Sequence, residues 1–250
     1  MRYFLEISYL GTAYHGWQAQ HNASSVQSAI EQALYTVLRK SYAIVGSGRT
    51  DTGVHACQQY CHLDSETAFD SSDLMYQLNA VLPADISILN ILHVKDDAHA
   101  RYDAQWRGYQ YKICRQKNPF EYQKAYLFYK PLDVELMNKA ASLLTGEQNF
   151  MAFSKVKTNV NHFFCNVFEA SWQEKKHMLC FNIRANRFLR GMVRALTGTL
   201  LMAGEGKIGL EEFSTIIESK NRRLAGPSVV PYGLYLKEIC YPDEIFIDTE

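Results

Sequence analysis

The sequence predicts a mixed α+β protein built from two similar halves. Segments rich in aromatic and β-branched residues alternate with segments whose apolar residues recur every three to four positions, the patterns of strands and helices. A βαββ-like order of these segments occurs twice, with no low-complexity run between the two copies. We therefore expect two lobes of antiparallel sheet and helix, 1–103 and 104–250, with a groove between them.

Length and composition are those of an ordinary globular chain. The 250 residues, 47% of them apolar, suffice to bury a sizeable core without disulfides or a structural metal. Six cysteines without framework spacing indicate a reducing compartment, where each serves as a small core residue. Glu6 interrupts the first apolar run, and no run approaches the roughly 18 residues of a membrane span. These observations predict a cytoplasmic protein with no membrane contact.

The elements of the first half follow from its residue patterns. Arg2–Tyr9 is expected to be a strand and Gly11–Asn22 a polar loop. A helix should follow, with a capping box formed by Ser24 and Gln27 and with one apolar side made of Val26, Ile30, Ala33, Leu34, Val37 and Leu38. The remaining elements are expected to be strands at Tyr42–Val45 and Cys57–Leu63, a helix at Ser72–Ala80 that ends before Pro83, and a strand at Ser87–Val94.

The second half repeats this order. A strand is expected at Arg107–Arg115, followed by a helix at Asp133–Leu144 that begins with an acidic cap and is closed by Gly146. The later elements are an antiparallel pair at Phe163–Trp172 and His177–Ala185, helices at Arg187–Ala203 and Leu210–Ser219, and a last strand at Leu234–Ile239.

The loop Gly46–Ala56 differs from the rest of the chain in its density of glycine and polar residues. Its glycines permit tight turns and close backbone approach. The guanidinium of Arg49, two residues from Asp51, favours the ionised form of that carboxyl, as a nucleophile or an ion-pair anchor requires. The loop is therefore a candidate catalytic site, and the alternative is a polar hairpin with a surface ion pair.

Asp51-Thr52-Gly53 is also the tripeptide of aspartic proteases. Those enzymes pair two aspartates so that one carboxyl stays protonated, and a single copy in 250 residues would require a homodimer. The residues before Asp51 are glycine, arginine and threonine, where a protease strand would be apolar. The protease hypothesis is therefore the weaker one.

Cys57 and Cys61, with His55 and His62 beside them, raise the question of a metal site. On a strand, residues four positions apart are separated by about 13 Å, too far to bind one zinc ion. Both cysteines are therefore interpreted as core residues, and no metal is expected.

The segment from Arg107 to Ile113 alternates with period two, so Arg107, Tyr109 and Tyr111 should share one sheet face. Two tyrosines and an arginine on one face would stack on a flipped base and hold a phosphate. The alternative is ordinary half-buried strand packing, because tyrosine favours strands.

Arg187, Arg190 and Arg194 are expected to lie together on one side of the predicted helix, with Gly191 and Gly198 beside them. Such a stripe would let a polyanion approach, and the alternative is a solvated charged face. The chain carries 26 basic and 26 acidic residues, so RNA binding would depend on local patches of this kind.

Seven segments, in order along the chain, give the sequence a family resemblance. It resembles the tRNA pseudouridine synthases of the TruA type in Gly11-Thr12-x-Tyr14-x-Gly16-Trp17-Gln18-x-Gln20, Val26-Gln27, Gly48-Arg49-Thr50-Asp51-x-Gly53-Val54-His55-Ala56, His99-Ala100-Arg101-Tyr102-x-Ala104, Arg107-x-Tyr109-x-Tyr111, Phe188-Leu189-x-x-Met192-Val193-Arg194 and Gly233-Leu234-Tyr235-Leu236.

The resemblance implies isomerisation of uridine to pseudouridine at positions 38 to 40 of the tRNA anticodon stem-loop. Asp51 would be the nucleophile, attacking either the ribose C1′ or the uracil C6. Tyr109 would stack on the flipped base and assist deprotonation at C5, and Arg194 would pair with Asp51. Substrate would be held by Arg49, Arg107, Tyr109, Arg187 and Arg190.

The resemblance also implies two ferredoxin-like lobes that flank a central basic cleft, with no cofactor, no metal, and a homodimer that grips tRNA with both subunits. The principal alternative in function is a non-catalytic RNA-binding protein of the same fold. Such a binder would have no reason to keep Asp51, Tyr109 and Arg194 together.

Overall fold

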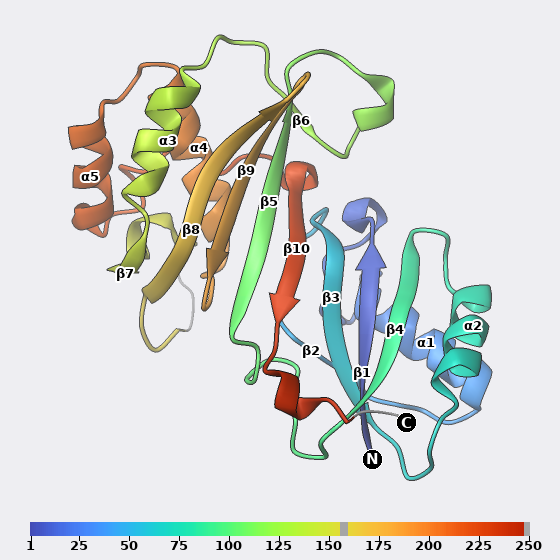
Figure 1. The fold of residues 1–250 in the computed structure, drawn as a ribbon. Coiled ribbons are helices and arrows are strands. Elements are labelled where there is room, and N and C mark those ends of the chain that lie inside the picture. The colour runs from blue at the N-terminus through green and yellow to red at the C-terminus, as the bar shows by residue number, and fades with distance from the viewer. Residues whose placement is uncertain (156–159, 248–250) are drawn as a thin grey trace. The chain divides into compact units, whose positions relative to one another are not determined.

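A computed structural model of the chain describes residues 1–155 and 160–247 (Figure 1). The chain divides into two compact units, Met1–Gln105 with Tyr235–Glu250, and Trp106–Leu234. Each unit carries a mostly antiparallel sheet with helices. The predicted mixture of helices and antiparallel strands is thus confirmed, and each unit is described by itself below.

The sheet of the first unit is centred on β1 (Arg2–Tyr9) and β3 (His55–Asp64). β1 lies between β3 and β4 (Ile86–Val94) and is antiparallel to both. The other edge of β3 is shared by two strands. β2 (Val45–Gly46) pairs antiparallel with its later part, and β10 (Leu234–Cys240) pairs parallel with its first residues, His55 and Ala56. The start of β3, where the candidate loop ends, is therefore held on both sides.

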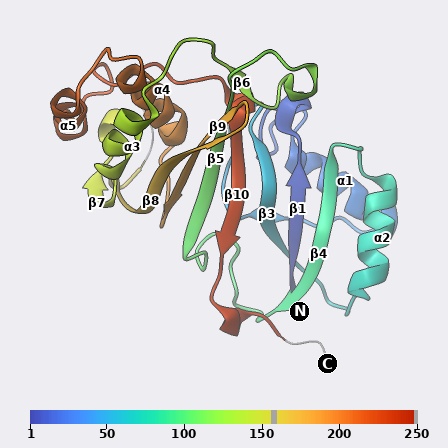
Figure 2. The ribbon, with the colours of Figure 1, turned by 45° about the horizontal axis from the view of Figure 1, so that its top comes forward.

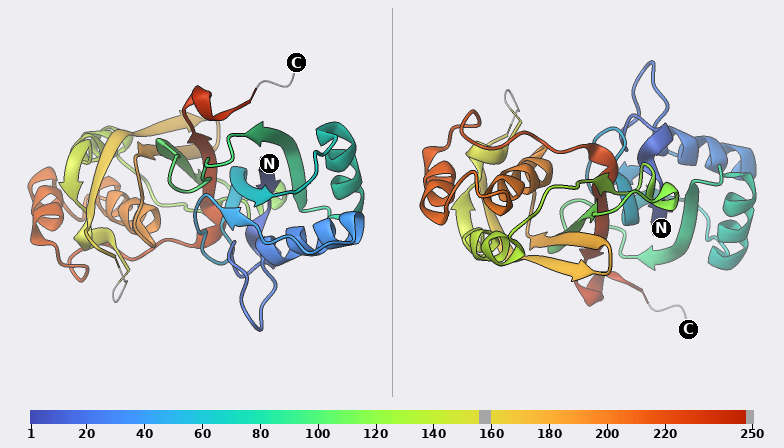
Figure 3. Two further views of the ribbon diagram at one scale, coloured as in Figure 1. Left: turned by 90° about the horizontal axis from the view of Figure 1, so that it is seen from below. Right: turned by 90° about the horizontal axis from the view of Figure 1, so that it is seen from above.

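Helices α1 (Val26–Leu38) and α2 (Ser71–Val81) pack against each other on one face of this sheet (Figure 3). The helix α1 starts one residue later than the predicted capping box. The Ser25 hydroxyl accepts from the Ser28 N–H at 3.1 Å, whereas the Ser24 hydroxyl donates to the Ala13 carbonyl at 3.2 Å. The box of Ser24 and Gln27 is wrong because the preceding loop takes the Ser24 side chain.

The strand predicted at Tyr42–Val45 shrinks to the two residues of β2. In the rest of the predicted segment, the backbone of Ile44 forms hydrogen bonds with side chains of α1 and not with a neighbouring strand. The Ile44 N–H donates to the Glu31 carboxylate at 3.2 Å, and the Gln27 amide donates to the Ile44 carbonyl at 3.1 Å. Those two bonds satisfy the groups that a sheet ladder would otherwise use.

The sheet of the second unit runs in the order β5 (Trp106–Cys114), β9 (Met178–Ala185), β8 (Phe164–Lys175), β7 (Gly146–Asn149), with each neighbouring pair antiparallel. The short strand β6 (Tyr126–Leu127) adds to β5 in parallel. Neither β6 nor β7 was expected, because strands of two and four residues are too short to show a period. The predicted pairing of the segments now called β8 and β9 is confirmed.

Two helices, α3 (Val134–Ser142) and α4 (Met192–Gly204), cover one face of this second sheet (Figure 2). A third helix, α5 (Leu210–Ser219), packs on α3 and α4. The helix α4 begins five residues later than predicted, because Gly191 has a φ of 73° and cannot continue a right-handed helix into the preceding residues. α4 is buried on nearly every side, and a Cβ at Gly198 would lie 1.8 Å from the Pro227 carbonyl oxygen.

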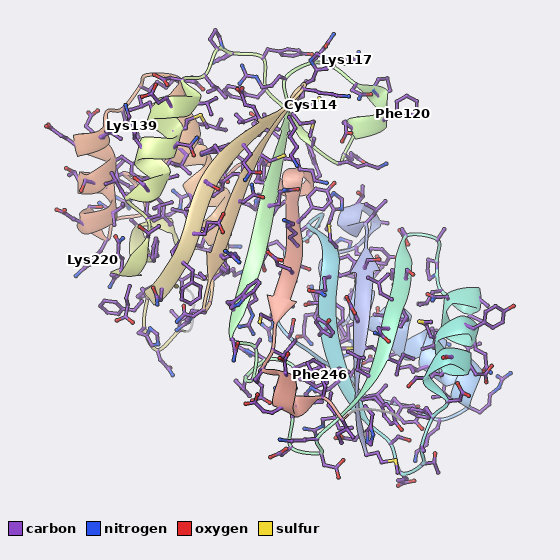
Figure 4. The ribbon with its side chains drawn as sticks, viewed as in Figure 1. Cys114, Lys117, Phe120, Lys139, Lys220 and Phe246 are labelled. Atoms are coloured by element: carbon purple, nitrogen blue, oxygen red, sulfur yellow. The ribbon has the colours of Figure 1, made fainter. Side chains whose placement is uncertain are left out.

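The last residues of the chain pack with the first unit, although the predicted second lobe was 104–250. β10 joins β3, and the Phe246 ring, labelled in Figure 4, lies 6.4 Å from the rings of both Phe4 and Tyr241. The Ile247 N–H also donates to the His93 carbonyl at 3.0 Å. Parallel pairing with β3 and aromatic packing therefore make 235–247 part of the first unit.

The cysteines only partly match their predicted place in the core. Cys61, Cys114 and Cys165 are buried, but Cys57 is exposed. β3 has one more residue than β1 between the pairs Tyr9–Ala56 and Ile7–Gln59. This bulge breaks the alternation of faces and turns Cys57 outward, so the core interpretation is wrong for that residue.

Among the helices of the described residues, none is both long and apolar enough to cross a membrane.

Candidate functional site

Asp51 lies in the loop 47–54, between β2 and β3, and its side chain is partly exposed. The loop ends in a tight turn in which the Val54 N–H donates to the Asp51 carbonyl at 3.2 Å. Gly53, the third residue of that turn, has a φ of 77°, which a type II turn requires and glycine adopts at no steric cost. The Asp-x-Gly order of the sequence therefore has a direct structural reason.

A second segment, residues 11–17, packs against this loop. The Gly53 N–H donates to the Tyr14 carbonyl at 3.3 Å, and the Trp17 N–H donates to the Thr50 carbonyl at 3.4 Å. Gly16 has a φ of 93°, and a Cβ there would lie 2.2 Å from the Thr50 carbonyl oxygen. The backbone of the loop is therefore held by a segment some 35 residues earlier.

Gly16→Ala is expected to disorganise the Asp51 loop, because the new methyl group would overlap the Thr50 carbonyl. Gly206→Ala is the matched control, since Gly206 also has positive φ, 69°, but no neighbouring atom within 4 Å. Both variants should lose about 1–2 kcal/mol from backbone strain. Thermal unfolding and amide exchange should show a larger loss for Gly16→Ala, with faster exchange at 50–54. Equal losses would refute the steric argument.

The side chain of Gln59 holds the start of the loop. Its amide nitrogen donates to the Gly48 carbonyl at 3.1 Å, and its amide oxygen accepts from the Ser47 hydroxyl at 2.5 Å. The Ser47 N–H donates to the Tyr60 carbonyl at 2.8 Å. Gln59 is fully buried, so these bonds are shielded from competing water.

His55, the first residue of β3, is fully buried and anchors the other end of the segment 11–17. Its Nδ1 accepts from the Gly11 N–H at 2.9 Å, which leaves the proton of the neutral ring on Nε2. The ring lies 4.7 Å from the ring of Tyr235, its neighbour in β10. His55 therefore has a structural role, because it joins the start of β3 to the segment 11–17 that supports the Asp51 loop.

Tyr14 joins the same segment to the end of α2 and the start of β4. Its hydroxyl donates to the Asp85 carboxylate at 2.7 Å. Burial, together with that carboxylate, raises the pKa of Tyr14 well above its ordinary value. Tyr14 is therefore a neutral hydrogen-bond donor at any physiological pH.

Tyr109, on β5 of the second unit, pairs with Ile183 and is half-buried. Its ring meets that of Phe188 edge to face, with centroids 4.9 Å apart. Tyr111 differs, because it is fully buried, its hydroxyl donates to the Val230 carbonyl at 2.8 Å, and burial raises its pKa. Tyr111 is therefore a core residue, and the predicted platform of two tyrosines reduces to Tyr109.

The four arginines predicted in this unit occupy different settings. Arg107 donates to the Asn186 carbonyl at 3.2 Å, and Arg187 bonds with His162 Nε2 at 2.9 Å. Arg190 is exposed in the turn before α4. Arg194 lies in the first turn of α4, where its Nε donates to the Val229 carbonyl at 2.7 Å. The predicted stripe on one helix is wrong, because Gly191 ends the helical path between Arg190 and Arg194.

The structure therefore places Asp51 and exposed Arg49 in one loop of the first unit, and Tyr109, Arg107, Arg187, Arg190 and Arg194 in the second unit. The sequence assigned no role at the site to three supporting residues: Tyr9, whose hydroxyl lies 2.8 Å from that of Thr50, Gln59, and Phe188, which packs edge to face on Tyr109. Only Phe188 carried a signal, since it stands in the segment Phe188-Leu189-x-x-Met192-Val193-Arg194. Within the described residues, no group of three or more His, Cys, Asp or Glu side chains could hold a metal ion.

Comparison with known proteins shows the family of the chain. The family model described as tRNA pseudouridine synthase matches residues 7–103 and 140–242, which include the Asp51 loop and Arg194. The chain belongs to this family, whose members convert uridine in tRNA to pseudouridine, and is an enzyme of that class.

Individual relatives carry a more specific name. The chain is 45% identical over 247 residues to tRNA pseudouridine synthase A of Bacteroides fragilis, with 98% of each chain covered. It is 44% identical over 248 residues to the protein of that name from Bacteroides thetaiotaomicron, covering 98% of this chain and 92% of the relative. For Porphyromonas gingivalis the identity is 43% over 250 residues, with coverage of 98% and 99%. The match is therefore to these proteins from end to end.

Proposed function

We propose that this enzyme isomerises uridine at positions 38 to 40 of the tRNA anticodon stem-loop, with Asp51 as the nucleophile. The observation that supports this role best is the Asp51 loop itself. It presents a partly exposed carboxylate on a backbone held by Tyr14, Trp17 and Gln59. A carboxylate positioned in this way can form a covalent intermediate with a reactive carbon.

The reaction breaks one glycosidic bond and forms another. Asp51 adds to the ribose C1′ or to the uracil C6, and the bond between C1′ and N1 breaks. The uracil turns and rejoins C1′ through C5, the bond to Asp51 breaks, the C5 hydrogen leaves as a proton, and N1 takes up a proton. Uridine and pseudouridine are isomers, so no oxidant or co-substrate is consumed, and we propose that no cofactor or metal takes part.

Tyr109 is proposed to stack on the extruded uracil and to assist removal of the C5 proton. The edge-to-face contact with Phe188 supports this role, because it limits rotation of the tyrosine ring on β5. Base extrusion costs a few kcal/mol, and stacking on an aromatic ring offsets part of that cost.

The arginines are proposed to hold the RNA. Arg194 would pair with Asp51, and Arg49, Arg107, Arg187 and Arg190 would contact the backbone of the extruded nucleotide and its stem. The exposure of Arg49 and Arg190 supports such contacts. Local contacts of this kind also fit a chain with no net charge, since phosphate binding needs cations only where the RNA lies.

The finer architecture is also a proposal. We propose ferredoxin-like lobes around a basic cleft, and a cytoplasmic homodimer that binds one tRNA with both subunits. The order β4-β1-β3-β2, antiparallel throughout with α1 and α2 on one face, supports the assignment for the first lobe. The order β5-β9-β8, with α3 and α4 on one face, supports it for the second.

The test is tritium release from anticodon stem-loops and full tRNAs labelled as 5-³H-uridine, with a single uridine at position 38, 39 or 40. Release from each of the three, and not from a control with uridine at position 33, is the expected result. Tight tRNA binding without release would favour a non-catalytic RNA-binding protein. Release from position 33 alone would refute the proposed target.

A further inference from the structure

The Tyr9 hydroxyl has no part in the reaction proposed above, yet it reaches the residue that precedes Asp51. Tyr9 is the last residue of β1, and its hydroxyl lies 2.8 Å from the Thr50 hydroxyl. Both side chains are buried, Tyr9 to 4% exposure and Thr50 to 8%. A hydrogen bond between two buried hydroxyls costs much more to break than an exposed one, because neither group gains water in exchange.

This bond complements the contacts that the loop makes elsewhere. Trp17 and Tyr14 hold carbonyl and amide groups of the loop backbone, and Gln59 holds Ser47 and Gly48. Thr50 adds a tie to β1 through its side chain. The Tyr9 ring also packs against the ring of Trp17, with centroids 6.3 Å apart. This contact fixes the position of the Tyr9 ring independently of the bond to Thr50.

We propose that Tyr9 is a positioning residue for catalysis. The hydrogen bond from Tyr9 to Thr50 fixes the backbone conformation at Asp51. It thereby fixes the direction from which the Asp51 carboxylate approaches the reacting carbon. This inference rests on the proposed role of Asp51 as nucleophile. A nucleophile displaced by about 1 Å can lose on the order of 10²-fold in rate, so one hydroxyl at this place can matter without touching substrate.

Tyr9→Phe removes the hydroxyl and keeps the ring. We expect kcat for pseudouridine formation to fall on the order of ten- to a hundredfold, with KM for tRNA unchanged within about twofold. Tyr3→Phe is the matched control. Tyr3 lies on the same strand, is 3% exposed, and its hydroxyl accepts from the Phe69 N–H at 3.1 Å. The Tyr3→Phe variant should lose about as much stability as Tyr9→Phe and should keep full activity.

Thr50 supplies the second half of the test. Thr50→Val should reproduce the loss in kcat, Thr50→Ser should retain activity, and the double variant Tyr9→Phe with Thr50→Val should be no slower than either single variant. Such non-additivity is expected of two groups that act as one contact. Independent losses that multiply in the double variant would overturn the proposal.

Amide exchange separates this inference from the proposed function. Tyr9→Phe should speed exchange at Gly53 and Val54, whose N–H groups hold the turn, and Tyr3→Phe should not. If wild type releases no tritium, the proposed function fails, and the exchange result alone decides whether Tyr9 holds the loop. If wild type is active, a Tyr9→Phe enzyme with wild-type kcat or with an effect confined to KM would refute the positioning role.

Discussion

Asp51→Asn is expected to abolish pseudouridine formation while leaving the fold and tRNA binding in place. The amide has nearly the shape of the carboxylate but cannot form the covalent intermediate, so kcat should fall by on the order of 10³-fold or more. Tritium release under single-turnover conditions measures this loss, and filter binding of the same labelled tRNA reports affinity. Asp51→Ala should lose activity to the same extent.

Asp64→Asn is the matched control for this experiment. Asp64 ends β3 in the same unit, and its carboxylate lies 2.7 Å from Arg2 Nε. The Arg2 guanidinium lowers the pKa of Asp64, so this carboxylate is ionised at neutral pH. Activity that survives Asp64→Asn but not Asp51→Asn assigns the loss to position 51. An Asp51→Asn enzyme that still forms pseudouridine would exclude this residue as the nucleophile.

Tyr109→Phe is expected to have the second largest effect. The ring that stacks on the base and its contact with Phe188 remain, so affinity for tRNA should stay within about twofold, whereas kcat should fall by about 10²-fold if the hydroxyl assists removal of the C5 proton. Tyr129→Phe, on a side chain that is 65% exposed, controls for loss of a tyrosine hydroxyl in general. The measurement is the rate of tritium release with enzyme in excess.

A kinetic isotope effect from deuterium at C5 of the substrate makes the test of Tyr109 sharper. If deprotonation at C5 becomes rate-limiting in the variant, substrate deuterated at C5 should react more slowly than ordinary substrate with Tyr109→Phe. Equal rates for the two substrates, or full activity of the variant, would leave Tyr109 only a stacking role.

The main elements could be predicted from sequence because their periodic patterns of apolar residues extend over many residues. Arg2–Tyr9 and Leu210–Ser219 have the predicted limits, and most of the other strands and helices differ by a few residues at their ends. Errors arose where a side chain took over a backbone hydrogen bond, as at Ile44 with Gln27 and Glu31. They also arose where one glycine changed direction, as at Gly191 before α4. Neither effect leaves a periodic signal.

The Asp51 loop was recognisable from its local composition, but its supports were not. Tyr9, Gln59 and the segment 11–17 come from other elements, and their contacts with 47–54 depend on the register of β1 against β3. Period two predicted that Tyr109 and Tyr111 share a face, but it could not show that Tyr111 reaches Val230 and is sealed in the core. The separation of Arg190 from Arg194 needed the backbone angle of Gly191.

The return of β10 to β3 has a consequence for synthesis on the ribosome. Chains emerge from the N-terminus, and domains ordinarily fold as they appear. Here His55 and Ala56, immediately after the Asp51 loop, gain their partners Tyr235 and Leu236 only after all of 106–234 has been translated. Until then that part of the β3 edge stays open to other chains. A nascent chain therefore completes its first unit only after the whole of the second unit has been translated.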